Sequence, residues 1–217
     1  MDQEKNTAGG NVSRGKGFMK AVMRIILFVT IAMVLHPQKM PNAVAMLDRP
    51  NPQIGPKDAP ITIVEFGDYG CPSCLIWAVA GMRQQLFDKY GDKIRFVWAD
   101  FPVVTLESPK AAEAGRCAYD QDKFWEYQDY VYNNYWGIDV DSLKFYAGQV
   151  GLDQAVFDQC LDSGVKQAEV NLDFQDAMLR SFHGTPTFLI NDKVVLHGMT
   201  SLDKFAAVID PILAETH

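Results

Sequence analysis

The chain has 217 residues, of which 48% are hydrophobic and 22% are charged, and its formal net charge is −7. This composition is typical of a globular protein with one domain, or of a domain with a large insertion. The acidic balance argues against nucleic acid as a partner, because no basic cluster follows the first 24 residues. Four cysteines are too few for a fold held together mainly by disulfides, so they are candidates for chemistry.

Residues 1–45 predict an export signal. Basic residues up to Arg24 precede an apolar run over 25–35, and Ala-Val-Ala at 43–45 follows as a small-x-small cleavage pattern. The run is shorter than the ~20 residues that span a bilayer, but extending it back to Phe18 allows an uncleaved signal anchor. We expect either cleavage after Ala45 or such an anchor. In both cases the rest of the chain is exported, to a periplasmic or otherwise extracytoplasmic compartment that favours disulfides.

The chain then predicts a βαβ unit. Residues 46–60 are rich in proline and indicate a linker, and the apolar, β-branched run 61–66 predicts a strand buried on both faces. After Cys71, one helix that ends at Gly91 is expected, followed by a strand at 94–98 and a right-handed parallel connection. The apolar stripe of this helix is formed by Leu75, Val79, Met82, Leu86 and Tyr90.

Residues 107–182 predict consecutive helices without a strand between them. Ser108 and Pro109 form an N-cap and first-turn pair, and Asp141 and Asp153 are typical of later N-caps. The last helix of this block is expected to bury one apolar face, formed by Val165, Ala168, Leu172, Leu179 and Phe182. Residues 183–217 then predict a ββα unit, with strands at 187–190 and 194–197, a turn at 191–192 and a helix over 201–214.

The motif Cys71-Pro72-Ser73-Cys74 lies where the first buried strand passes into a helix. Pro72 suits the first helical position, which places Cys71 at the N-cap, facing the free N–H groups of Ser73 and Cys74. These donors and the helix dipole favour a thiolate, so the pKa of Cys71 is expected below the ~8.5 of a free thiol. Cys74, one turn further on, is expected to be more buried and to act as the resolving partner.

Glu65 lies six residues before Cys71, inside an otherwise apolar strand. An isolated carboxylate there would be costly unless it is paired, protonated or exposed. Two interpretations stay open: a proton acceptor or pKa modulator beneath the cysteines, or a carboxylate at the solvated end of the strand.

The stretch 66–74, Phe-Gly-Asp-Tyr-Gly-Cys-Pro-Ser-Cys, and the later stretch 184–188, Gly-Thr-Pro-Thr-Phe, together resemble the DsbA-like branch of the thioredoxin superfamily. The resemblance covers roughly residue 50 to the C-terminus. It implies a thioredoxin-like α/β fold, βαβ…ββα, formed by 61–106 and 183–217, with an inserted all-helical domain at 107–182. It also implies that Pro186 is a cis-proline facing the cysteine pair and that Thr185 offers backbone groups to an extended substrate peptide.

The function that follows is protein disulfide oxidoreductase, most simply a dithiol oxidase that uses no cofactor and no metal. Its partners are expected to be exported proteins with cysteine thiols and a separate redox partner, for which a membrane protein is one candidate. The best-known strong oxidase of the family has histidine where this chain has Ser73 and valine where it has Thr185. Because Pro72 has no N–H and a serine hydroxyl is a neutral donor, we expect an oxidant of intermediate strength.

Several alternatives stay open. A disulfide isomerase or reductase has the same fold, although isomerases resembling DsbC carry an N-terminal dimerisation domain for which the chain has too little room.

Cys117 and Cys160 are expected to form a structural disulfide, or else to be two buried free thiols. With Cys71 and Cys74 they would in principle make a four-thiolate zinc site, but such sites commonly use two close-spaced pairs. The methionines beyond residue 50 do not cluster as copper delivery would require. The intact cysteine pair argues against a binding module without redox activity.

Overall fold

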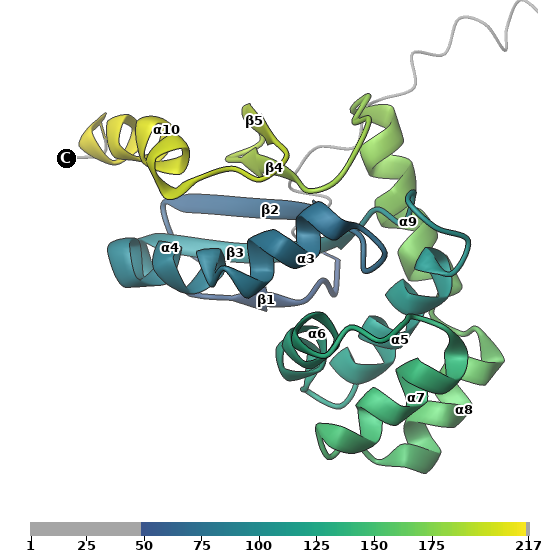
Figure 1. Cartoon of the computed structure of the whole chain (residues 1–217). Helices are drawn as coiled ribbons and strands as arrows, with labels where there is room; N and C mark the ends of the chain where they lie inside the picture. Colours follow the sequence, from purple (N-terminus) through teal and green to yellow (C-terminus); the bar gives the residue numbers. More distant parts are fainter. Residues whose placement is uncertain (1–48, 216–217) are drawn as a thin grey trace, which may run out of the picture. The chain divides into compact units, whose positions relative to one another are not determined.

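The computed structural model describes residues 49–215 (Figure 1). The predicted export signal and the start of the predicted linker therefore lie outside the described residues. Within 49–215, no helix combines the length and the apolar character needed to cross a membrane.

In the described part of the chain, five strands form one mixed sheet in the order β1-β3-β2-β4-β5. β2 and β3 pair in parallel, whereas the other three pairs are antiparallel. This arrangement confirms the predicted parallel pair and the C-terminal hairpin. The strands are β1 (Gln53–Ile54), β2 (Ile61–Gly67), β3 (Ile94–Asp100), β4 (Thr187–Ile190) and β5 (Val194–His197).

The edge of β3 is covered by a strand that the sequence did not predict. β1 pairs with β3 through Gln53 and Ile54, and Asn51 just before it is buried. Pro52 accepts a hydrogen bond from the Trp98 N–H at 2.9 Å, which a proline at a sheet edge can do without its own N–H. Gln53 and Ile54 therefore belong to the sheet, which corrects the prediction of linker for this part of 46–60.

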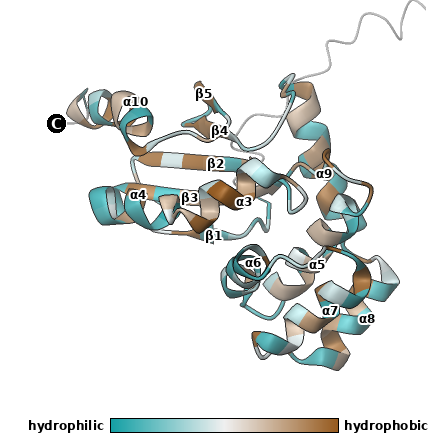
Figure 2. Cartoon of the chain, viewed as in Figure 1, coloured by the Kyte–Doolittle hydropathy of each residue, from teal (hydrophilic) through white to brown (hydrophobic). Residues whose placement is uncertain are grey.

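The helix after Cys71 is two helices, α3 (Pro72–Val79) and α4 (Met82–Tyr90), so the prediction of one continuous helix was wrong. The break falls at Gly81, whose φ of 69° is left-handed and unfavourable for residues with a Cβ. The break also changes the buried face: Trp77 is buried, while Val79 is 49% exposed. Figure 2 shows the hydrophobic residues of β2 and α3.

Five helices follow β3 and precede β4, as predicted for the insertion. They are α5 (Ser108–Tyr119), α6 (Phe124–Asn133), α7 (Val140–Gln149), α8 (Gln154–Ser163) and α9 (Gln167–Leu179), and α10 (Leu202–Glu215) ends the described chain. Asp153 caps α8 as predicted, because its carboxylate accepts two first-turn N–H bonds. The cap of α7 is Asp139, and the predicted Asp141 lies in the first turn instead.

The predicted apolar face of α9 was wrong except at Phe182, which is buried just after the helix. Val165, Leu172 and Leu179 are 63%, 48% and 43% exposed, and the buried side of the helix carries Asp173 and Asp176. Both carboxylates form ion pairs with arginines. Apolar periodicity cannot reveal a helix that buries charge, because burial of a carboxylate depends on a partner elsewhere in the chain.

A disulfide joins α5 to α8. Cys117 and Cys160 have an S–S distance of 2.01 Å and a Cα–Cα distance of 5.9 Å. Cys117 lies in the core of the helical insertion, with 1% of its surface exposed. The bond occupies both sulfurs and so removes two of the four thiolates that the alternative zinc site requires.

Replacing Cys117 and Cys160 together by alanine is expected to lower the free energy of unfolding by about 4 kcal/mol, because the disulfide spans a sequence separation of 43 residues. Urea unfolding without reductant measures the change. The matched control replaces Cys71 and Cys74 by alanine, which removes a much shorter potential loop and should cost far less through chain entropy. A Cys117/Cys160 variant as stable as the wild type would contradict the stabilising role of this bond.

Candidate active site

The cysteine motif is placed by a short turn between β2 and α3. β2 ends at Gly67, Cys71 is the N-cap of α3 in an extended conformation, and Pro72 is the first helical residue. Proline fits there because its missing N–H would have no helical partner. Cys71 therefore lies at the N-terminal end of the helix, as its spacing from Pro72 predicts.

Cys71 has a strongly stabilised thiolate. Its pKa is lowered to about 5, first by the Cys74 thiol, which donates to it, and further by Thr185 and the N–H groups of Cys74 and Ser73. Burial acts in the opposite direction and is outweighed. Ser73 thus contributes through its backbone amide, and Pro72 supplies the helix start. At neutral pH Cys71 is a thiolate and a good leaving group.

Cys74 lies beneath Cys71 and differs from it in every respect that governs reactivity. It is fully buried, whereas Cys71 is 6% exposed, and both are free thiols in this structure. Burial, the neighbouring Cys71 and the Glu65 carboxyl raise the pKa of Cys74 well above its ordinary value. The geometry therefore separates a slightly exposed thiolate from a fully buried, protonated thiol.

Glu65 lies in the middle of the sheet, opposite Trp98 of β3 and Phe188 of β4. It is 3% exposed, which excludes the solvated strand end. Burial raises its pKa to about 8, while Arg83 lowers it and the nearby Cys71 raises it further. A carboxyl that titrates near neutrality beside a buried thiol can hold or release a proton during exchange.

The loop before β4 closes the site on the other side. The Thr185–Pro186 peptide bond is cis, and the Cys71 sulfur lies 3.2 Å from the Thr185 carbonyl oxygen, to which Cys71 donates only in its protonated form. The Thr185 hydroxyl also favours the thiolate. Apart from that sulfur, the hydroxyl has no hydrogen-bond partner among residues 49–215. The structure thus brings Cys71, Thr185 and Pro186 together from segments more than 100 positions apart.

Two hollows flank Cys71. One, of about 270 Å³, is almost wholly apolar and is lined by Tyr69, Leu75, Ile76 and Tyr135 next to the cysteine. The other, of about 390 Å³, lies beyond Pro186 and includes His183 and His197. A peptide that crosses Cys71 meets a mostly apolar lining in both hollows, and the second also offers two histidines.

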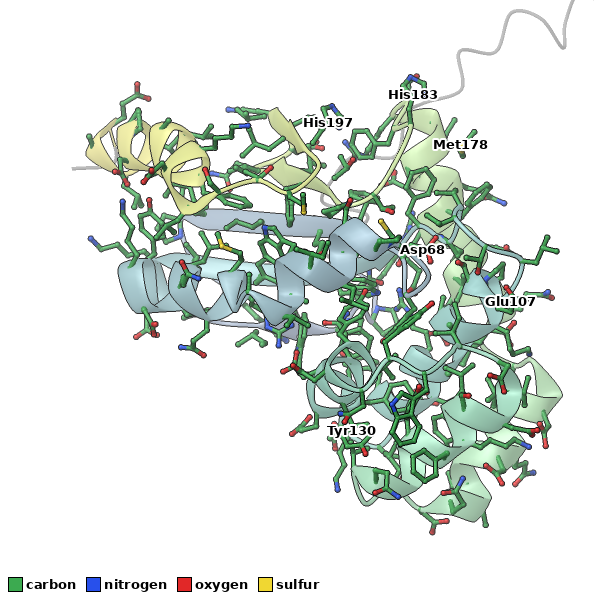
Figure 3. All side chains as sticks on the ribbon, viewed as in Figure 1. Asp68, Glu107, Tyr130, Met178, His183 and His197 are labelled. Atoms are coloured by element: carbon green, nitrogen blue, oxygen red, sulfur yellow. A yellow bond between two sulfur atoms is a disulfide. The ribbon has the colours of Figure 1, made fainter. Side chains whose placement is uncertain are left out.

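The sequence reasoning missed Asp68. This residue is 1% exposed, and its carboxylate accepts the N–H groups of Gly70, Val103 and Val104 (Figure 3). A signal was available: an aspartate two residues before the residue whose N–H it accepts is typical of an Asx-turn. The two valines gave no such signal, because they lie more than 30 positions away.

The sheet, the five helices inserted between β3 and β4 and the facing cis-proline loop together form a thioredoxin-like fold with a helical insertion. A family model described as Thioredoxin matches residues 48–211, and the chain belongs to that family.

The chain is also similar to parts of several known proteins. A Salinispora arenicola protein named Na(+)/H(+) antiporter NhaA 1 is 33% identical over 164 residues, which are 75% of this chain and 24% of that protein. The chain therefore spans about a quarter of the length of the antiporter relatives it matches. The probable disulfide bond formation protein D of Bacillus cereus is 32% identical over 124 residues, covering 54% of this chain and 56% of that one. The crystal structure of oxidised BdbD from Bacillus subtilis has the same fold, with a TM-score of 0.69 and 23% identity over 76% of this chain and 94% of that one.

Glu65→Gln is expected to change how stability depends on pH. With a folded pKa of about 8 against an ordinary value of 4.5, wild-type Glu65 is easier to ionise when unfolded. The oxidised wild type should therefore lose stability, on the order of a few kcal/mol, as pH rises through this window. Glutamine does not titrate, so the variant should lack this decline.

Urea unfolding of the oxidised proteins across this pH range measures the effect, since oxidation removes the titration of Cys71. Glu126→Gln, at an exposed position, is the control and should follow the wild type. Parallel profiles for the wild type and Glu65→Gln would show that Glu65 does not carry the raised pKa.

Proposed function

We propose that this chain is an extracytoplasmic protein disulfide oxidoreductase that oxidises exported proteins through a Cys71–Cys74 couple. One observation carries the proposal: a slightly exposed sulfur with a pKa of about 5 lies at a helix N-terminus, above a fully buried thiol and 3.2 Å from the carbonyl before a cis-proline. This arrangement supplies a good leaving group, a resolving thiol and a peptide-binding edge.

The reaction balances without a cofactor. A substrate thiolate attacks Cys71 of the Cys71–Cys74 disulfide, so the bond between the cysteines breaks and Cys74 leaves as a thiolate. A second substrate thiolate then attacks the substrate sulfur of the mixed disulfide and expels the Cys71 thiolate. Two electrons pass from the substrate thiols to the enzyme cysteines.

Glu65 is proposed to donate and accept the proton that moves to and from Cys74 during this exchange. Cys74 leaves as a thiolate in surroundings that strongly favour its protonated form. With its pKa near 8, Glu65 holds a proton at neutral pH and can supply it to Cys74, directly or through an intervening group. In the reverse reaction the carboxylate takes the proton back, which lets Cys74 attack.

Substrate binding is proposed to use the groups around Cys71. The backbone of Thr185 pairs with an extended peptide, and Pro186 keeps that edge open beside the sulfur. The apolar hollow at Tyr69, Leu75 and Ile76 accommodates an apolar side chain of the substrate. These contacts suit unfolded chains, whose cysteines and apolar residues are both accessible.

The direction of exchange and the compartment are part of the proposal. Thiolate stabilisation at Cys71 favours the reduced enzyme, which makes the oxidised enzyme a better oxidant. The Cys117–Cys160 disulfide supports an oxidising compartment, as does the export signal predicted at 1–45. A separate redox partner would reoxidise the pair. We also propose the division into a thioredoxin-like domain, 61–106 and 183–217, and an inserted domain, 107–182.

Cys71→Ser is expected to abolish thiol exchange. In Cys74→Ser, the Cys71 thiolate should attack a disulfide-bonded peptide, release one peptide thiolate and accumulate the mixed disulfide, because the resolving thiol is missing. Oxidation of a dithiol peptide measures turnover, and non-reducing electrophoresis detects the trapped species. Cys117→Ala/Cys160→Ala is the matched control and should retain exchange. Wild-type turnover by Cys71→Ser would refute the assigned roles.

Ser73→His is expected to lower the pKa of Cys71 below about 5 and to raise the reduction potential, because a charged imidazole is a stronger donor than a neutral group. For this two-electron couple, about 30 mV corresponds to 1.4 kcal/mol. Ultraviolet thiolate absorbance against pH and equilibration with glutathione give the two quantities. Ser73→Ala, which keeps the backbone N–H, should change both much less. A potential that stays constant or falls in Ser73→His would show that charge at this position does not tune the couple.

A further inference from the structure

The turn that carries Cys71 is held by a carboxylate outside the reacting pair. The Gly70 N–H donates to Oδ1 of Asp68 at 2.7 Å, and the N–H groups of Val103 and Val104 donate to Oδ2 at 2.8 Å each. The first bond lies within the turn, and the other two come from the segment between β3 and α5. Asp68 therefore joins two loops that are separate in the sequence, at the position labelled in Figure 3.

The backbone of the same residue contacts both cysteines. The Asp68 carbonyl accepts the Cys71 N–H at 3.1 Å. The Asp68 N–H donates to the Cys74 sulfur, which lowers the pKa of that thiol against the larger effect of burial. The Tyr132 hydroxyl donates to the Asp68 carbonyl at 3.3 Å. A displacement of Asp68 would therefore change hydrogen bonds at both cysteines.

The two loops also fit each other closely. A Cβ added at Gly70 would lie 2.6 Å from Ser108 Oγ and 2.9 Å from Thr105 Cγ2, so a glycine is needed for this approach. Thr105 and Ser108 are braced by reciprocal bonds of 3.1 Å, from each backbone N–H to the hydroxyl oxygen of the other residue. Asp68 is thus anchored to a segment that has its own internal support.

We propose that Asp68 is a positioning residue for thiol exchange, whose carboxylate fixes the turn so that Cys74 meets the Cys71 sulfur in the geometry that resolves a mixed disulfide. The inference rests on the proposed function and adds to it a residue that acts through the cysteines without contacting substrate. In the reaction used to test it, glutathione disulfide first bonds to Cys71 and releases one glutathione thiolate. Cys74 then attacks Cys71, which forms the Cys71–Cys74 bond and releases the second glutathione thiolate.

The test uses full-length reduced protein mixed rapidly with glutathione disulfide, so that formation of the mixed disulfide and its resolution are timed separately. Asp68→Asn replaces one acceptor oxygen by an NH₂ group, which cannot accept the N–H bonds of the turn or of the neighbouring segment. We expect resolution to be slower by about tenfold or more, because small displacements of reacting groups are costly. Formation of the mixed disulfide should change less.

Asp153→Asn is the matched control. Asp153 also uses its carboxylate to accept two backbone N–H groups, those of Ala155 and Val156, at 3.0 and 3.1 Å, but at the start of α8. Asp153 Oδ1 accepts both bonds and asparagine is a comparable N-cap, so this variant should fold and resolve the mixed disulfide like the wild type. Tyr132→Phe removes only the hydroxyl that donates to the Asp68 carbonyl and should slow resolution about two- to threefold.

Resolution at the wild-type rate in Asp68→Asn, or equal slowing in Asp153→Asn, overturns the inference. If Asp68→Asn does not fold, Tyr132→Phe decides, and an unchanged rate in that variant overturns it. A wild-type protein that exchanges no disulfide with glutathione would instead overturn the proposed function.

Discussion

The fold depends on one buried cation. Arg116 of α5 is 1% exposed and lies between two carboxylates, Asp100 at the end of β3 and Asp173 of α9. Its guanidinium also donates to the Pro50 carbonyl and to the Asn51 side chain, both at 3.2 Å. Burial raises the pKa of Asp173 to about 6 even though Arg116 lowers it. Removal of one partner would leave uncompensated buried charge, which typically costs 3–5 kcal/mol. The Arg116 side chain therefore joins β3, the segment before β1, α5 and α9.

This network reaches the cysteine turn through an aromatic side chain. Trp98 Nε1 donates to Asp100 at 2.7 Å, and the Trp98 ring lies 5.9 Å from that of Tyr69, two residues before Cys71. The same ring fills the space where a Cβ of Gly67 would be, only 2.1 Å from the nearest ring carbon. Gly67 is therefore required at the end of β2, where the turn begins. The position of the turn thus follows from buried charge on one side and from the Asp68 hydrogen bonds on the other.

Local features of the sequence predicted most strands and helices and the cysteine motif, whereas interactions between residues far apart in the sequence could not be predicted. The β-branched run at 61–66 and the Pro72 next to Cys71 act through their own backbone, so a strand and a helix N-cap could be predicted from them. Glu65 was noticed because a carboxylate is anomalous in an apolar strand. Asp173 gave no such contrast in a polar helix, and its partner Arg116 lies 57 positions away. The break at Gly81 was missed because the apolar spacing continues across it, although a glycine was visible there.

Cys71 and Glu65, whose pKa values are shifted in opposite directions, affect the reduction potential in different ways. Above about pH 5, where Cys71 ionises, and below the raised pKa of Cys74, the reduced enzyme carries one thiolate and one protonated thiol. Reduction of the Cys71–Cys74 disulfide then takes up one proton, whereas reduction to two ordinary thiols takes up two. The enzyme potential should fall by about 30 mV per pH unit and that of an ordinary dithiol by about twice as much. The oxidised enzyme therefore becomes a stronger oxidant relative to its substrates as pH rises. Glu65 does not alter this relation until it ionises near pH 8, so proton supply to Cys74 and thiolate stabilisation at Cys71 act together across the neutral range.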